Sequence, residues 1–391
     1  MNAAGPSETP PHSVTVTTGS RLHFGLLTHR PQSGREFGGL GVMIGSPGWQ
    51  VTVSTPASQP ATAAASPDAA SSADASSEDA SPADATSLPG SVASRKACVT
   101  EAGSEILNDV RIDASDAALL ACADIEARIH RILAHWSRSV RENVLEMSRL
   151  NVHVDKAIPG HRGLGSGTQL GLAIGRALSE LSGETFVSTE TLAERTGRGL
   201  RSAVGTWGFE SGGLIVDGGK LPEQSVGSCV ARCDFPEAWR FLLIAPSGGY
   251  GLSGADEVAA FERLQGMPTS RTERLCRIAL MDLLPAIADA DITAASTALT
   301  EYGRVSGEYF SVVQGGVFAD DRMAEIGRRV THRGRGFFQT SWGPTCAALC
   351  ASDDELADLQ RELEADSSGS LTLIAARPLN RGASVITQPA D

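Results

Sequence analysis

The sequence predicts an α+β protein of two domains, and three observations support this fold class. The chain has 391 residues and a hydrophobic content of 41%, which is enough for two ordinary cores. Segments that alternate apolar and polar residues mix with segments of helical spacing, without the regular strand–helix repetition of a parallel α/β fold. The short, strongly apolar segment WRFLLIAP (239–246) indicates a central strand near the start of a second domain.

The first part of the chain is mainly strand-like. SVTVTTGSRLHFGLL (13–27) alternates like a strand and then breaks at Gly19. The glycine-rich run REFGGLGVMIG (35–45) leads into another strand, and WQVTVST (49–55) and KACVT (96–100) alternate in the same way. These segments predict a sheet at the start of the first domain.

Residues 56–94 differ in composition from the rest of the chain. They contain no aromatic residues and almost no branched aliphatic residues, so they cannot bury enough surface to offset their ordering entropy. We expect a disordered low-complexity insertion in a surface hairpin, tolerated because loop length costs little. A regulatory segment is the alternative.

Helical and strand-like patterns then alternate along the chain. Residues 116–136 have helical spacing, and LNVHVDKAI (150–158) places Leu150, Val152 and Val154 on one strand face. The glycine-rich segment IPGHRGLGSGTQLGLAIGRAL (158–178) opens another predicted helix. Its apolar stripe consists of Leu170, Ile174, Ala177, Leu178 and Leu181.

The remaining elements complete the expected pattern. ESGGLIVDGG (210–219) predicts a hairpin around glycines, and three helical stretches are expected within 254–330. GRGFFQTSWGPTCAALC (334–350), a helix at 352–365 and a final strand LTLIAARP (371–378) follow. The domain boundary is expected near 234–239, which gives an N-terminal domain of 1–235 and a C-terminal domain of 236–391.

Charge and hydropathy exclude several classes of function. A net charge of −13 argues against nucleic acid as a partner, so an anionic ligand would need its own pocket of Arg and Lys. The sequence has no run of 18 apolar residues, and its N-terminus lacks the features of a signal peptide. We therefore expect a cytoplasmic protein that does not bind a membrane.

The cysteines favour reduced thiols over a metal site. There are seven, an odd number, and they are scattered along the chain. Cys229 with Cys233 and Cys346 with Cys350 have CxxxC spacing, for which a zinc site is the alternative. No further Cys or His pair has zinc-finger spacing.

The glycine-rich loop has the features of an anion-binding site. A strand, a turn with Gly163, Gly165 and Gly167, and a helix start place unpaired N–H groups and the positive end of the helix dipole together. Ser166 and Thr168 supply hydroxyls for capping or for phosphate oxygens, with His161 and Arg162 nearby. A P-loop would need Lys after its last glycine, and a dinucleotide fingerprint would need GxGxxG, so neither motif fits.

Pro159 followed by GLGSGTQLGLAIGRAL resembles the phosphate-loop signature P-x-x-x-G-L-G-S-S of the GHMP small-molecule kinases, with Gly167 in place of the second serine. SWGPT (341–345) resembles their C-terminal glycine-containing motif. Longer segments resemble the β-ribofuranosylaminobenzene 5′-phosphate synthases, a GHMP-fold family that does not use ATP to phosphorylate. They are SRLHFGLL (20–27), REFGGLGVMI (35–44), GLGSGTQL (163–170), GRGLRSAVGTWGFESGGLIVDGG (197–219), SGEYFSVVQGG (306–316) and FQTSWGPT (338–345).

This resemblance implies a two-domain GHMP-kinase-like fold, with an N-terminal ribosomal-S5-domain-2-like α/β domain and a C-terminal ferredoxin-like α+β domain. It implies that 5-phosphoribosyl diphosphate is joined to 4-aminobenzoate or 4-hydroxybenzoate with release of diphosphate and carbon dioxide. The product begins part of tetrahydromethanopterin, a one-carbon carrier. Mg²⁺ is the expected cofactor, and a homodimer is common in the family. The alternatives are an ATP-dependent GHMP kinase and a catalytically silent binding protein.

The resemblance and the residue chemistry together suggest site residues. Diphosphate is assigned to Gly163, Gly165, Ser166, Gly167, Thr168 and Gln169. The catalytic candidates are Arg21, His23, Arg198 and Arg201, where Arg pairs bidentately with phosphate or carboxylate. Gln314, Ser341, Trp342 and Gly343 are expected to line the same cleft from the second domain, and Glu210 and Asp217 are the candidate Mg²⁺ ligands. The alternatives are a structural histidine for His23 and core packing for Trp342. For Arg198 and Arg201 the alternative is solvated charges at a helix end, and for Glu210 and Asp217 it is exposed acids of a hairpin.

Overall fold

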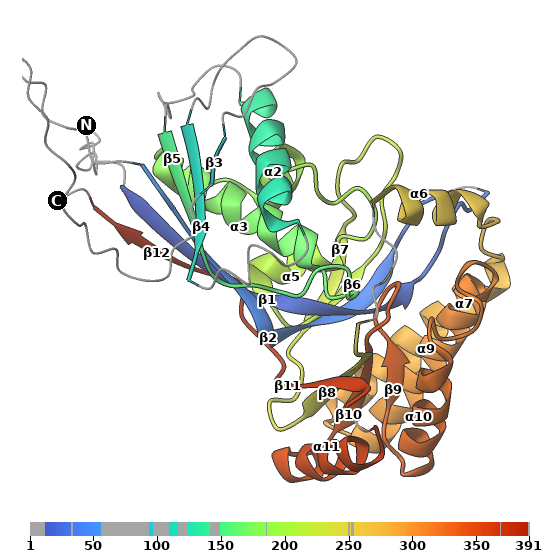
Figure 1. Ribbon diagram of the computed structural model, residues 1–391. Helices are drawn as coiled ribbons and strands as arrows, with labels where there is room; N and C mark the ends of the chain where they lie inside the picture. Colours follow the sequence, from blue (N-terminus) through green and yellow to red (C-terminus); the bar gives the residue numbers. More distant parts are fainter. Residues whose placement is uncertain are drawn as a thin grey trace, which may run out of the picture.

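The computed structural model describes residues 12–32, 34–55, 94–96, 109–115, 124–140, 149–184, 186–248, 251, 254–367 and 369–389. Two β-sheets, each with helices packed against it, form two lobes (Figure 1). The strands and helices mix without βαβ repetition, so the predicted α+β class is confirmed. Among the described residues, no helix combines the length and the apolar character needed to cross a bilayer.

The first lobe is built on a sheet of order β12-β1-β2-β5-β4-β3, with β6 paired to β2 and β7 paired to β6. Helices α3 and α5 pack on this sheet, and α2 and α4 pack against α3. Its strands are β1 (Ser13–Leu26), β2 (Gly39–Ser54), β3 (Ser94–Lys96), β4 (Asp109–Ala114), β5 (Arg149–Lys156), β6 (Leu214–Asp217), β7 (Cys229–Cys233) and β12 (Ser384–Gln388). Its helices are α2 (Ile125–Ser139), α3 (Ser166–Leu181), α4 (Thr189–Arg195) and α5 (Val204–Ser211).

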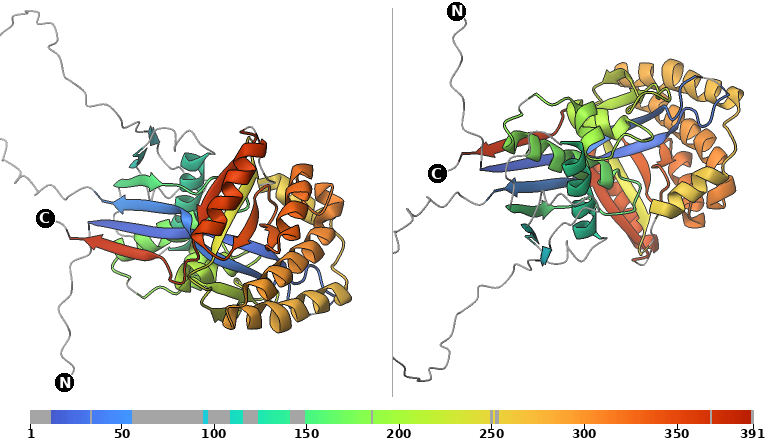
Figure 2. Two further views of the ribbon diagram at one scale, coloured as in Figure 1. Left: turned by 90° about the horizontal axis from the view of Figure 1, so that it is seen from below. Right: turned by 90° about the horizontal axis from the view of Figure 1, so that it is seen from above.

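The second lobe is built on an antiparallel sheet of order β11-β8-β10-β9. The helices between residues 254 and 332 gather at one end of the molecule, around the far ends of β1 and β2 (Figure 2), whereas α11 packs on the sheet of this lobe. The strands are β8 (Arg240–Pro246), β9 (Phe337–Gln339), β10 (Cys346–Cys350) and β11 (Leu371–Ala376). The helical elements are α6 (Gly254–Arg263), α7 (Thr269–Arg277), the π-helical η1 (Ile278–Leu283), α8 (Leu284–Ala288), α9 (Ile292–Gln314), α10 (Asp321–His332) and α11 (Asp353–Ser367).

Strands β1 and β2 are longer than the sequence predicted. They pair antiparallel along their whole length, with register shifts after Gly19 and after His23. The predicted break at Gly19 is wrong, because this residue forms a bulge inside one continuous strand. A Cβ there would lie 2.1 Å from the carbonyl oxygen of Ile44, so the two backbones can approach only at a glycine.

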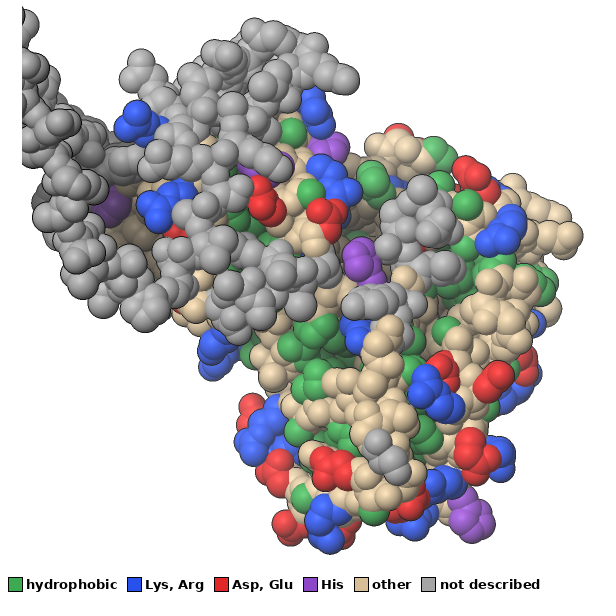
Figure 3. Space-filling model, in the orientation of Figure 1, with side chains coloured by type: hydrophobic (Ala, Val, Ile, Leu, Met, Phe, Trp, Pro, Cys, Tyr) green, Lys and Arg blue, Asp and Glu red, His purple; other side chains and the backbone are tan. Residues whose placement is uncertain are grey.

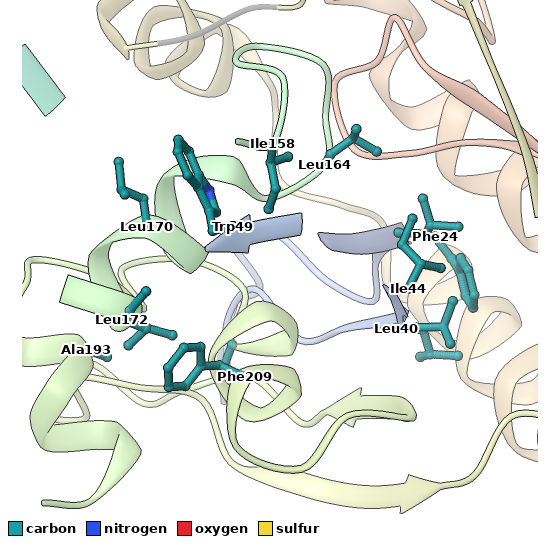
Figure 4. Close-up of a cluster of buried hydrophobic side chains, with 14 of the residues drawn as sticks. Phe24, Leu40, Ile44, Trp49, Ile158, Leu164, Leu170, Leu172, Ala193 and Phe209 are labelled. Atoms are coloured by element: carbon teal, nitrogen blue, oxygen red, sulfur yellow. The ribbon is translucent and has the colours of Figure 1, made fainter. Parts of the chain in front are cut away.

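The core of the first lobe lies between its sheet and α3. The predicted stripe of Leu170, Ile174, Ala177, Leu178 and Leu181 is buried, which confirms the helical periodicity. Trp49 on β2 packs at the start of this helix and donates a hydrogen bond from Nε1 to the Ser166 carbonyl at 3.0 Å (Figure 4). The loop before α3 is therefore anchored to the core of the lobe.

The predicted central strand at 239–246 is confirmed as β8, which is buried throughout between β10 and β11. The three helical stretches expected within 254–330 are divided further, since Asp291 and Asp320 accept backbone N–H groups and start α9 and α10. Over the surface of this lobe, acidic and basic side chains are intermixed (Figure 3). Arg329 on α10, for example, pairs with Glu362 and Asp366 on α11.

The end of the chain was not predicted correctly. The strand expected at 371–378 is present as β11, but a further strand, β12, returns to the first sheet and pairs with β1. The range 236–391 therefore includes a strand of the first lobe, because this edge of β1 is open to pairing. The boundary near 234–239 remains a prediction, and residues 56–93 of the expected insertion lie outside the described residues.

The CxxxC pairs do not form a metal site. Cys229 and Cys233 are the two ends of β7, and Cys346 and Cys350 are the two ends of β10. Residues four apart in a strand are separated by roughly 13 Å, so a pair cannot share one ion. In the described part of the chain, no cluster of His, Cys, Asp or Glu is suited to a metal.

Candidate active site

A cavity of about 740 Å³ lies between the two lobes. It is lined by β1, the loop before α3, the segment before α5, and residues of α2, α6 and α9. The loop at 339–343 closes it from the second lobe. The cavity contains thirteen of the predicted site residues: Arg21, His23, Gly163, Gly165, Ser166, Gly167, Thr168, Arg198, Arg201, Gln314, Ser341, Trp342 and Gly343.

The glycine-rich loop is held against the second lobe by hydrogen bonds. The Gly163 carbonyl accepts from Arg21 Nη1 at 3.1 Å and from Thr340 Oγ1 at 3.0 Å. The same Thr340 hydroxyl accepts from the backbone N–H of His23 at 2.9 Å. Gly163 has φ 76°, and a Cβ there would lie 2.3 Å from the Thr340 carbonyl oxygen. Only glycine fits this contact between the lobes.

The start of α3 is open toward the cavity. Its N-cap is Gly165 in the left-handed conformation, with no side-chain cap and no acidic residue in the first turn. The positive end of the helix dipole is therefore not neutralised locally. The Ser166 hydroxyl is already used, since it donates to the Ile158 carbonyl at 3.0 Å and accepts from Arg128 Nη2 at 2.9 Å. Ser166 thus positions Arg128, which the sequence did not predict.

Arg198 lies along the first turns of α3. A Cβ at Gly167 would be 3.3 Å from its Nη1, and one at Gly171 would be 2.9 Å from its Nε. Gly167, where the kinase motif has a second serine, therefore makes room for this guanidinium. The Arg198 Nε is buried and has no hydrogen-bond partner in the described residues.

Part of the positive charge of the cavity has no carboxylate partner among the described residues. Arg21, Arg128 and Arg198 form no salt bridge with a described residue, although Glu257 and Asp124 lie in the same cavity. Burial lowers the pKa of Arg21 and of Arg128 to about 10. Burial, with the nearby Arg131, also lowers the pKa of Arg198. Such a site favours binding of a multiply charged anion, whose oxygens would pair with these three guanidinium groups.

Aromatic side chains line the second-lobe side of the cavity. Trp342 packs edge-on against Phe261 and Phe310, with ring centroids 5.1 and 4.8 Å apart. Arg201 stacks over Phe261 at 4.8 Å and pairs with Glu257 through two contacts of 2.8 and 2.9 Å. The arginine that was predicted to bind phosphate or carboxylate is therefore already paired in this conformation.

Three predicted site residues do not reach the cavity. Gln169 is fully buried and bridges Thr18 and the Gly205 carbonyl, so its side chain supports the core. Glu210 is exposed on α5, outside the cavity lining. Asp217 is fully buried, and its carboxylate accepts from the N–H groups of Ala203 and Gly219 and from the Ser202 hydroxyl. The predicted Mg²⁺ pair of Glu210 and Asp217 is therefore not assembled.

The remaining second-lobe residues are in place. Gln314 donates to the Gly316 and Val317 carbonyls and accepts from Gln339, so its amide is fixed at the cavity wall. Ser341 has φ 53° and donates its N–H to the His23 carbonyl at 3.0 Å. The loop at 339–343 is thereby tied to β1.

Sequence reasoning missed Arg128, Arg131, His135, Glu257 and Phe261, all of which line the cavity. For Arg128 a signal was available. It lies three residues after Ile125 and four before Ile132, inside the apolar stripe of the predicted helix, and it is only 7% exposed. A charge in such a stripe is rarely buried without a functional or structural partner. Glu257 and Phe261 had no comparable local signal.

Asp217 gives a testable dependence of stability on pH. Burial raises the pKa of its carboxyl from 3.8 to about 6, so the folded state binds the proton more tightly than the unfolded state. This contribution to the free energy of unfolding is present below pH 3.8 and is lost as pH rises through 6. The free energy of unfolding of Asp217→Asn, measured relative to that of the wild type, should therefore rise by about 3 kcal/mol between pH 3.8 and pH 6. Urea unfolding of both proteins at pH 4, 5, 6 and 7.5 measures this; parallel curves would contradict it.

Comparisons with known proteins agree with the geometry. Residues 128–208 match the family model "GHMP kinases N terminal domain". The chain is 31% identical over 264 residues to the β-ribofuranosylphenol 5′-phosphate synthase of Methanothermobacter thermautotrophicus, covering 64% of this chain and 78% of that protein. It is 32% identical over 247 residues to the protein of the same name from Archaeoglobus fulgidus, covering 58% and 72%.

Solved structures show the same fold at low identity. The homoserine kinase of Cytophaga hutchinsonii superposes with a TM-score of 0.60 at 13% identity, over 98% of this chain and 100% of that one. The mevalonate diphosphate decarboxylase of Staphylococcus aureus superposes with a TM-score of 0.58 at 9% identity, over 96% and 98%. At such identities these similarities concern the fold alone.

Proposed function

The chain belongs to the family of the β-ribofuranosylphenol 5′-phosphate synthases, and on this premise we propose the reaction that its cavity carries out. In this reaction the enzyme transfers the ribosyl 5-phosphate group of 5-phosphoribosyl diphosphate to the ring carbon of 4-hydroxybenzoate that bears the carboxylate. Diphosphate and carbon dioxide are released. Of the two acceptors that the sequence left open, we choose 4-hydroxybenzoate over 4-aminobenzoate, because the relatives' name specifies a phenol.

The observation that carries this proposal is the set of Arg21, Arg128 and Arg198, which lack carboxylate partners in the described residues and lie in one cavity with the open end of α3. Departure of diphosphate leaves an oxocarbenium-like sugar and concentrates negative charge on the leaving group. Preorganised cationic donors stabilise that charge more in the transition state than in the ground state. We place the diphosphate at α3, between Arg128 and Arg198.

The acceptor ring fits the opposite side of the cavity. Trp342, Phe261 and Phe310 form an apolar aromatic wall there, which suits a flat benzoate. This places the ring within the same cavity as the leaving group, so the ribose lies between them. The enzyme then contributes mainly positioning, since loss of carbon dioxide itself restores aromaticity.

Mg²⁺ does not fit a dedicated protein site here. Asp124 and Glu257 are the carboxylates among the described cavity residues, and they pair with Arg131 and Arg201. We propose that Mg²⁺ enters as part of the substrate, as the counterion of the diphosphate, and we derive no protein step from it. Supply of the product to tetrahydromethanopterin synthesis, a cytoplasmic location and a homodimer remain predictions from the resemblance.

The test is an assay with 5-phosphoribosyl diphosphate, Mg²⁺ and either benzoate labelled at the carboxyl carbon. We expect labelled carbon dioxide and diphosphate to appear in equal amounts, only when both substrates are present. A parallel series with ATP and small alcohols tests the kinase alternative. ATP-dependent phosphorylation without carbon dioxide release would replace our proposal.

A further inference from the structure

A chain of three hydrogen-bonded side chains leads from the core of the first lobe to the cavity. Asp217 on β6 is fully buried, and its Oδ2 accepts from the Ser202 hydroxyl at 3.2 Å. The Ser202 Oγ lies 2.9 Å from Nε2 of His23 on β1. His23 and Ser202 line the cavity, whereas Asp217 does not. A buried carboxylate is thus connected to a cavity imidazole through one hydroxyl.

The order of donors fixes the tautomer of His23. Both oxygens of Asp217 accept hydrogen bonds, from Gly219 N–H at Oδ1 and from Ala203 N–H at Oδ2. Although burial raises the pKa of this carboxyl to about 6, it is ionised at neutral pH and acts as an acceptor at both oxygens. The single hydroxyl proton of Ser202 therefore goes to Asp217. His23 must then carry its proton on Nε2 and donate it to Ser202. Nδ1 is left with a lone pair and has no hydrogen-bond partner among the described residues.

We propose that Nδ1 of His23 is the base that takes the para-hydroxyl proton of the acceptor, and that Ser202 and Asp217 are positioning residues that hold it ready. This inference rests on the proposed function, since it requires a phenolic acceptor. It adds a proton-transfer step and assigns the specificity between a hydroxyl and an amino acceptor to one side chain. His23 is tied at its backbone to Thr340 and Ser341, so it is close to the loop that carries Trp342.

The step is balanced. A ring electron pair forms the bond to the anomeric carbon, and the pair of the breaking carbon–oxygen bond leaves with diphosphate. The para oxygen becomes a protonated carbonyl and gives its proton to Nδ1. The carbon–carboxylate bond then breaks, its electron pair restores the aromatic ring, and the resulting phenolate takes the proton back from His23. No oxidant, reductant or external proton is needed.

The environment of His23 suits this role. Burial and the neighbouring Arg21 keep the pKa of the imidazole well below 6.5, so it is neutral and able to accept a proton at neutral pH. Lys220, just after β6, acts on Asp217 at the other end of the hydrogen-bonded chain and lowers the pKa of its carboxyl. A weak base is sufficient, because a protonated carbonyl in the ring intermediate is a strong acid. With 4-aminobenzoate the same intermediate is an iminium ion, which can keep both protons.

The experiment compares the two acceptors in each variant, so every variant is its own control. In His23→Gln we expect kcat with 4-hydroxybenzoate to fall by about 100-fold, and kcat with 4-aminobenzoate by less than about 5-fold. Ser202→Ala should lower the ratio of kcat with 4-hydroxybenzoate to kcat with 4-aminobenzoate by about 10-fold. In this variant the base is still present, but the tautomer of His23 is no longer fixed by a hydrogen bond to Ser202. Melting temperature and circular dichroism confirm that each variant is folded.

Equal losses with both acceptors, or no loss with either, would overturn the role of His23. If the wild-type enzyme uses only 4-hydroxybenzoate, His23→Ala is assayed with added imidazole, and absence of rescue overturns the proposal instead. Failure of the wild type to release carbon dioxide with either acceptor would reject the proposed function itself. The two failures are therefore distinguishable.

Discussion

Arg198→Ala is expected to lower kcat/KM for 5-phosphoribosyl diphosphate by about 1,000-fold. Two charge-assisted hydrogen bonds to the leaving group, at about 2 kcal/mol each, account for this factor. The guanidinium lies against Gly167 and Gly171, and no other group in the described residues neutralises it. Loss of this guanidinium should therefore lower kcat/KM and have little effect on the stability of the fold.

The same variant should not lose stability. Burial and Arg131 lower the pKa of Arg198, which means that the folded protein holds this charge unfavourably. Removing it should leave the free energy of unfolding unchanged or raise it by up to about 1 kcal/mol. Loss of activity with equal or higher stability separates a functional charge from a structural one.

The measurement combines steady-state kinetics with urea unfolding, and Arg274→Ala is the matched control. Arg274 is an exposed arginine of α7 whose guanidinium pairs with Glu301 on α9, away from the cavity lining. It should change neither quantity appreciably. Wild-type kcat/KM in Arg198→Ala would remove this residue from the diphosphate site.

Gly163→Ala is expected to destabilise the contact between the lobes by about 3 kcal/mol, more than the strain at a positive φ alone costs. The added Cβ would lie 2.3 Å from the Thr340 carbonyl oxygen, a backbone atom that cannot rotate away. The loop before α3 would have to leave the position fixed by Arg21 and Thr340. We expect kcat to fall by about 100-fold as well, because misplacement of a positioning loop by about 1 Å is sufficient.

Gly334→Ala is the control for backbone conformation. Gly334 has φ 77°, nearly the same as the φ 76° of Gly163, but a Cβ there would meet no atom within 4 Å. It should cost about 1 kcal/mol of unfolding free energy and leave kcat unchanged. Similar losses in the two variants would show that the steric contact with Thr340 is unimportant.

The sequence was sufficient to predict most of the elements, including α3 and β8, and the glycine-rich loop before α3 that lines the cavity. Burial of Leu170, Ile174 and Leu181 on α3 follows from a 3.6-residue period, and the complete burial of β8 follows from a continuous apolar run. These patterns are local, so they can be read without knowing the fold. The resemblance of the ordered motifs indicated the same family that the comparisons show.

The assembly of the site depends on contacts between residues that are far apart in the sequence. Ser202 meets His23 across 179 positions, and Thr340 meets the backbone of His23 across 317, distances along the chain at which no periodicity operates. Asp217, expected as a metal ligand, is instead enclosed by backbone N–H donors, because β6 pairs within the sheet. Sequence patterns show which residues can be buried or charged, whereas packing decides which of them face the same cavity.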